Sequence, residues 1–286
     1  MTDLAYYFSI PLIQNMFAAT ALACILCGTV GAYVVVGRKV AVTGGIAHTT
    51  FGGVGFAYYV MSVYGISWMS PMAGALLFSV AAAVVMVVCR RADGVREDTV
   101  IGALWAVGMA AGVVFMCYMD RSVIVPSSYE SILFGNMLLI DSGKLAVMAA
   151  VSASVLAAVM FFYRDFRIMT FDRVHAKVSG MNVAALDLLL HVLIAVTCVM
   201  VANVVGIVMI IALMTVPAAI GSIVSRGMAG TMAAGVVSAL AMSFLGLLLS
   251  LAMDTPPGAT VVLVLGASFA AVLAVRRLAL GATAEE

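Results

Sequence analysis

The 286-residue chain is 65% hydrophobic and 9% charged, whereas soluble domains have about 45–50% apolar and about 25% charged residues. This composition excludes an ordinary water-soluble domain and predicts a membrane protein surrounded by lipid. Fourteen Lys and Arg residues nearly balance 13 Asp and Glu residues, so the net charge of +1 gives no general attraction to nucleic acid. The 26 glycines and six prolines favour closely packed membrane helices over the alternating strands of a transmembrane barrel.

Apolar segments of membrane-crossing length follow one another along the chain. A crossing needs about 20 residues, because a helix rises about 1.5 Å per residue through about 30 Å of hydrocarbon. The nine segments are residues 11–36, 44–66, 71–89, 99–118, 145–163, 183–203, 204–225, 229–252 and 258–275. The run from Val183 to Val224 is too long for one crossing, so we expect a turn between Asn203 and Gly206. The sequence therefore predicts an all-α, polytopic helical bundle.

The bundle is expected to have eight or nine spans in a single domain over residues 1–286. Eight spans result if one segment is re-entrant, and the shorter apolar stretch from Ile132 to Ile140 is expected to form an interfacial or re-entrant helix. With nine crossings and the N-terminus outside, 12 of the 14 Lys and Arg residues fall on the cytoplasmic side, leaving Arg121 and Lys144 outside. This bias follows the positive-inside rule and predicts a cytoplasmic C-terminus.

Few polar side chains inside these spans could bind an ion. Asp187 is the only acidic residue well inside a span, and we expect an interfacial cap that reaches water or a nearby Arg. Imidazole suits late first-row metals better than Mg²⁺ or Ca²⁺, which makes His48 and His191 candidate ligands. For His191, a hydrogen bond between helices is the more common role. The phosphate-binding motif G-x-x-x-x-G-K-[ST] and the hydrolase motifs H-E-x-x-H and G-x-S-x-G are absent, so we expect no enzyme activity and no tightly bound cofactor.

Five short motifs are spread over most of the chain. They are Gly37-Arg38-Lys39 with Gly44-Gly45-Ile46-Ala47-His48; Arg96-Glu97-Asp98-Thr99 with Ile101-Gly102; Leu133-Phe134-Gly135-Asn136; Phe171-Asp172 through Ala176 to Gly180; and Gly206-Ile207 through Leu213 to Pro217-Ala218-Ala219, with Pro257-Gly258 later. In this order they resemble elements of the zinc/manganese/iron permease family of bacterial ABC transporters, among them its G-D-A-x-S-H, E-D-T-x-I-G and L-F-G-N motifs.

The resemblance implies a permease subunit of an importer for divalent metal ions, in the bacterial inner (cytoplasmic) membrane. Such a subunit pairs with a second permease subunit, receives metal from an extracytoplasmic metal-binding protein and is driven by ATP-binding cassette subunits that bind and hydrolyse ATP. The motif match assigns metal binding to His48. It also implies that a cytoplasmic loop couples the permease to the ATPase. This loop is expected to form a short interfacial helix and contains Phe171, Asp172, Arg173, Ala176 and Gly180.

The first motif departs from the family pattern. Gly44 replaces the Asp that commonly stands four residues before the His, and Ala47 replaces a Ser. Because Mn²⁺ would lose a hard oxygen ligand, zinc or iron is the preferred cargo. Gly44 is a candidate site residue because of its place in this motif, and the alternative explanation is that a glycine here allows close packing of helices. Two other functions remain open, namely a permease for iron chelates in the same superfamily and an ATP-independent metal carrier or channel.

Overall fold

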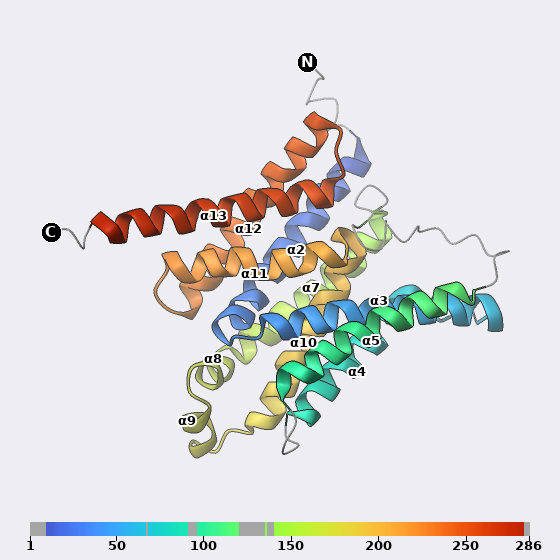
Figure 1. Cartoon of the computed structure of the whole chain (residues 1–286), viewed down its shortest axis with the longest axis horizontal. Coiled ribbons are helices and arrows are strands. Elements are labelled where there is room, and N and C mark those ends of the chain that lie inside the picture. The colour runs from blue at the N-terminus through green and yellow to red at the C-terminus, as the bar shows by residue number, and fades with distance from the viewer. Residues whose placement is uncertain (1–9, 67, 91–95, 120–134, 136–139, 283–286) are drawn as a thin grey trace.

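The computed structural model describes residues 10–66, 68–90, 96–119, 135 and 140–282, which form a bundle of helices (Figure 1). The long helices are α2 (Pro11–Val36), α3 (Val40–Tyr64), α4 (Pro71–Cys89), α5 (Glu97–Cys117), α7 (Ser142–Phe161), α10 (Val183–Val205), α11 (Ile207–Val224), α12 (Met228–Met253) and α13 (Pro257–Ala282). Two short helices, α8 (Tyr163–Phe171) and α9 (Arg173–Val178), connect α7 to α10. The prediction of an all-α bundle is confirmed.

Within the described ranges, eight helices are long and apolar enough to cross a membrane. The protein is therefore a multi-pass membrane protein. Helix α3 overlaps the expected span 44–66 and has 25 residues, but with its glycines, threonines and His48 it is not among these eight. The interfacial helix expected from Ile132 to Ile140 lies outside the described residues, except for Gly135 and Ile140.

The long apolar run between Val183 and Val224 is interrupted at Gly206. The φ of Gly206 is +84°, a value that residues with a side chain rarely adopt, so a glycine here ends α10 and lets α11 begin. The two helices consequently run in different directions (Figure 1). Gly135 packs against this break, where an added Cβ would lie 2.7 Å from the backbone nitrogen of Gly206. The predicted turn between Asn203 and Gly206 is confirmed.

Helix α3 lies beside α4 and α5 and also contacts α10 and α11 (Figure 1). Glycines allow the closest approach. A Cβ at Gly52 would lie 2.6 Å from the carbonyl oxygen of Gly108, and one at Gly55 would lie 2.5 Å from that of Gly112. Small residues are favoured at such contacts because helices within a membrane associate through close van der Waals packing. Helix α3 is thus enclosed by protein, which lets it carry polar side chains away from lipid.

Gly52→Ala is expected to push α3 away from α5, because the added methyl group overlaps the carbonyl oxygen of Gly108. The free energy of unfolding should fall by about 1–3 kcal/mol, the usual cost of overpacking. Gly102→Ala on α5 is the matched control, since its Cβ would have no neighbour within 4 Å. Denaturant titration of the purified protein in detergent measures both variants, and equal stabilities would contradict the close contact.

Candidate functional site

His48 lies in the enclosed part of α3 with its ring half-buried. The indole of Trp105 on α5 stacks on the imidazole, with ring centroids 4.7 Å apart and an angle of 26° between the planes. The Nδ1 atom of His48 is buried and has no hydrogen-bond partner among the described residues. A buried polar atom without a partner is costly. A bound metal ion would supply the missing partner, since imidazole nitrogen is a common metal ligand.

The other two histidines have different surroundings. His175 is exposed on the short helix α9. His191 is buried in α10, and its Nδ1 donates to the carbonyl oxygen of Asp187, 2.6 Å away in the preceding turn. The Nδ1 of His191 is also 3.5 Å from the ammonium of Lys39. Of the two histidines in long helices, His48 is therefore the one whose buried Nδ1 has no partner among the described residues.

Gly44 lies one turn before His48, against the same tryptophan. An added Cβ would lie 3.4 Å and 3.5 Å from two carbons of the Trp105 ring and 3.8 Å from the Cδ1 atom of Ile211. These are ordinary packing distances, so an added Cβ would rest against the ring without displacing it. Sequence analysis missed Trp105, because an aromatic residue in an apolar span carries no signal of metal binding.

His48 supplies one ligand and not a complete site. Across the described ranges, no group of three or more His, Cys, Asp or Glu side chains is arranged to hold a metal ion. A divalent ion that passed His48 would need further ligands from backbone carbonyls, water or a second subunit, because desolvating an ion without replacement ligands is very costly.

The predicted coupling loop contains the short helix that the sequence led us to expect. Asp172 caps α9, because its carboxylate accepts a hydrogen bond from the backbone N–H of His175 at 2.8 Å. Ala176 is fully buried, and Gly180 takes a φ of +79° just beyond the helix. The loop also carries exposed apolar side chains, namely Phe171 at 63%, Val174 at 73% and Val178 at 82% exposure. Apolar groups this exposed on a short helix suit a protein contact.

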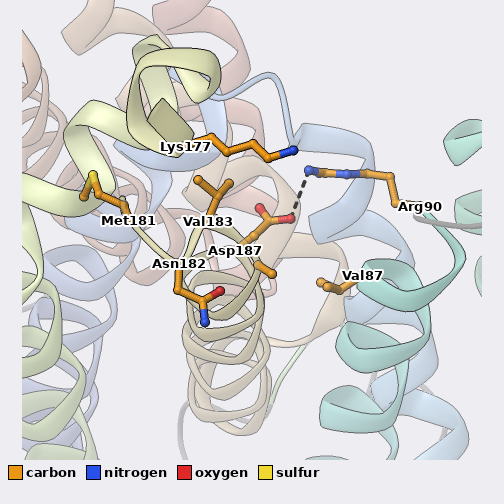
Figure 2. A pocket seen from close by; sticks show the side chains of 8 residues that line it. Val87, Arg90, Lys177, Met181, Asn182, Val183 and Asp187 are labelled. Atoms are coloured by element: carbon orange, nitrogen blue, oxygen red, sulfur yellow. Dashed lines mark ion pairs between the residues drawn. The ribbon is translucent and has the colours of Figure 1, made fainter. Parts of the chain in front are cut away.

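Near the start of α10, three cations converge on the buried carboxylate of Asp187. Its Oδ1 accepts from the Nζ of Lys39 at 2.6 Å and from Arg173 at 2.9 Å. Its Oδ2 lies 3.0 Å from Arg90 (Figure 2). We call these four residues the Asp187 cluster. It joins α10 to the turn between α2 and α3, to the end of α4 and to α9.

The structure corrects one expectation for Asp187 and confirms another. The expectation of a helix cap is wrong, because the side-chain oxygen of Asn182 caps α10 by accepting from the backbone N–H of Ala185 at 3.1 Å. The expectation of a nearby arginine is confirmed by Arg90 and Arg173. Asp187 is only 4% exposed, so its carboxylate is surrounded mainly by protein.

Lys39 is the member of the cluster that sequence analysis missed as a partner. It lies in the basic turn between α2 and α3, yet it is only 6% exposed. Burial lowers the pKa of Lys39 below its ordinary value, and the charge of the Asp187 carboxylate opposes that change. Glu97 lies 3.7 Å from Arg90 and adds a second negative charge beside the three cations.

The Asp187 cluster borders a cavity of about 370 Å³ between α4, α9 and the start of α10. Figure 2 shows Asp187, Arg90 and Lys177 at this cavity, with apolar side chains of Val87, Met181 and Val183 around them. Charged and apolar groups thus meet where the short helices join the long ones.

A comparison with protein-family models decides the family. The model described as the ABC 3 transport family matches residues 9–276, nearly the whole chain. The chain belongs to the ABC 3 transport family.

Two relatives cover almost the full length of this ABC 3 family member. An uncharacterized membrane protein of Synechocystis sp. is 35% identical, over 92% of this chain and 90% of that protein. The manganese transport system membrane protein MntC of Halalkalibacterium halodurans is 28% identical, over 94% of this chain and 90% of that protein. The family match over residues 9–276 reaches all nine long helices.

The fold of this ABC 3 family member also matches a solved structure. A chain of PsaBC from Streptococcus pneumoniae, solved in complex with Fab, superimposes with a TM-score of 0.81 over 94% of this chain and 95% of that one. At 22% sequence identity, this likeness supports the arrangement of the helices.

Asp187→Asn is expected to lower the free energy of unfolding by about 3–5 kcal/mol, because removing one partner of a buried ion pair leaves the other buried without a counter-charge. The stranded group is Lys39. Asp254→Asn is the matched control, since Asp254 is exposed and lies in no ion pair within the described part of the chain. Denaturant titration in detergent compares the two variants, and a wild-type midpoint for Asp187→Asn would contradict the cluster.

Proposed function

We propose that this member of the ABC 3 transport family is the membrane-spanning subunit of a bacterial ABC importer for divalent transition-metal ions. The observation that carries the proposal is the unpartnered Nδ1 of His48, within an enclosed helix and at the family's ligand position. The relative that is named a manganese transport system membrane protein supports a metal as the cargo. The whole chain serves as one permease domain in the inner membrane, with the N-terminus outside.

The translocation path forms between two permease subunits. One imidazole cannot replace the water that a dication sheds, so two subunits related by a two-fold axis each contribute His48, with carbonyls and water completing the shell. An extracytoplasmic metal-binding protein delivers the ion to the outer side. The mostly exposed helices α5 and α13 leave apolar surface for lipid or for the second subunit.

Zinc or ferrous iron is the proposed cargo. Gly44 supplies no carboxylate, and the ring of Trp105 packs beside it. Imidazole without a carboxylate donor suits these borderline ions better than Mn²⁺. A chelated ion already carries its own ligands and has less need of His48, so the unpartnered imidazole favours the free ion over an iron chelate.

ATP-binding cassette subunits drive the transport from the cytoplasmic side. The exposed apolar side chains Phe171, Val174 and Val178 fit a groove on such a subunit, as helices do in helix-in-groove recognition. ATP is bound and hydrolysed by these subunits, because the permease lacks a phosphate-binding loop of its own. Membership of an ABC transport family favours this mechanism over an ATP-independent carrier.

His48→Ala should reduce metal uptake to background while the protein still inserts, because the alanine variant offers no ligand to a desolvated ion. Uptake of radioactive zinc and iron into cells or vesicles measures the loss at matched membrane levels. His48→Cys, which restores a soft ligand, should retain part of the zinc uptake. Normal uptake by His48→Ala would remove His48 from the mechanism.

Phe171→Ala should weaken attachment of the ATPase about tenfold, as truncation of an aromatic anchor does in other interfaces. Asp172→Ala should act in the same direction, because it removes the cap that holds α9 in place. Copurification and binding of the tagged ATPase subunit measure the effect, with Leu245→Ala on α12 as the control for loss of an exposed apolar side chain elsewhere. Wild-type binding and hydrolysis in both loop variants would show that the contact surface is wrong.

A further inference from the structure

The Asp187 cluster physically connects the proposed ATPase-binding helix to the helix that carries His48. Arg173 belongs to α9, and Lys39 immediately precedes α3. We propose that Asp187 is a positioning residue that transmits the ATP-driven movement of α9 to α3 and α4, and thereby to the metal path. This inference rests on the proposed function and adds the residues that link the ATPase-binding helix α9 to the proposed metal site at His48.

The bond pattern places Arg173 and Lys39 in direct competition. Both donate to the same carboxylate oxygen, Oδ1 of Asp187, at 2.9 Å and 2.6 Å. The side chain of Arg173 is 42% exposed, whereas that of Lys39 is 7% exposed. Arg173 therefore forms the outer side of the cluster and Lys39 the inner side. If a displacement of α9 moves Arg173, one cation leaves Oδ1. The electrostatic attraction between Lys39 and Oδ1, and the geometry of their bond, then change.

The cluster also allows the outer bond to break. If Arg173 leaves, the carboxylate keeps Lys39 through Oδ1 and Arg90 through Oδ2. No buried charge is then left without a partner. Breaking a buried ion pair is costly mainly when it does leave such an unpaired charge. The bond to Arg173 can thus open and close during a transport cycle while the inner part of the cluster remains intact.

From Lys39 the movement reaches His48 along a single rigid element. The carbonyl oxygen of Lys39 accepts the N–H of Thr43 at 3.2 Å, so the lysine is bonded into the first turn of α3. His48 follows nine residues later, about 13 Å along the helix at about 1.5 Å per residue. Glycine contacts hold α3 closely against α4 and α5, and such close packing transmits a displacement along the helix. Arg90 links the end of α4 to the same carboxylate.

The test compares the amount of metal transported per ATP hydrolysed in vesicles that contain the permease with its ATPase subunits. Arg173→Gln should lower this ratio about fivefold or more, the low end of typical coupling between distant sites. Because the ratio is taken per ATP hydrolysed, it does not depend on how much ATPase the variant binds. Arg226→Gln is the matched control, since Arg226 is an exposed basic loop residue outside the Asp187 cluster. Phe171→Ala, a docking variant, should lower hydrolysis and transport together and leave the ratio unchanged.

The outcomes separate this inference from the proposed function. A wild-type ratio in Arg173→Gln, whether or not that variant binds less ATPase, would overturn the role of the Asp187 cluster while the wild type still imports metal. A fall in the ratio confined to Arg173→Gln supports it. Wild-type vesicles that hydrolyse ATP and import no zinc or iron would overturn the proposed function as well.

Discussion

A charged or polar group buried in a membrane protein needs partners to replace the water it has lost, and this constraint governs both important sites in the chain. Asp187 meets it completely, with three cations on its two carboxylate oxygens. His48 leaves one ring nitrogen unmet among the described residues. A fully satisfied group suits a structural connection, whereas an unsatisfied one suits a ligand that comes and goes.

Helix α3 connects these two sites because it is enclosed. Glycine contacts bring it against α4 and α5, and Lys39 at its start belongs to the Asp187 cluster. Enclosure by neighbouring helices explains how a helix with several polar residues lies within an apolar bundle. The same enclosure places the Trp105 ring on His48 and next to Gly44, so packing and the proposed metal site depend on the same residues.

Features set by local sequence could be predicted, whereas features set by contacts between distant segments could not. Apolar length gives the helices, a glycine with positive φ gives the break at Gly206, and the polar segment around Asp172 gives the short helix α9. The bond between Lys39 and Asp187 joins residues 148 positions apart, and no local pattern reports it. The stacking of Trp105 on His48 is equally hidden, because a tryptophan in an apolar span is indistinguishable from a lipid-facing one.

The central claim is that the permease moves metal ions only when a separate ATPase drives it. Vesicles reconstituted with the purified chain, alone or together with its ATP-binding subunits, test this claim most directly when zinc uptake is measured with and without ATP. The account predicts uptake only with both the partner subunits and ATP present. Zinc entry at the same rate through the chain alone would contradict it.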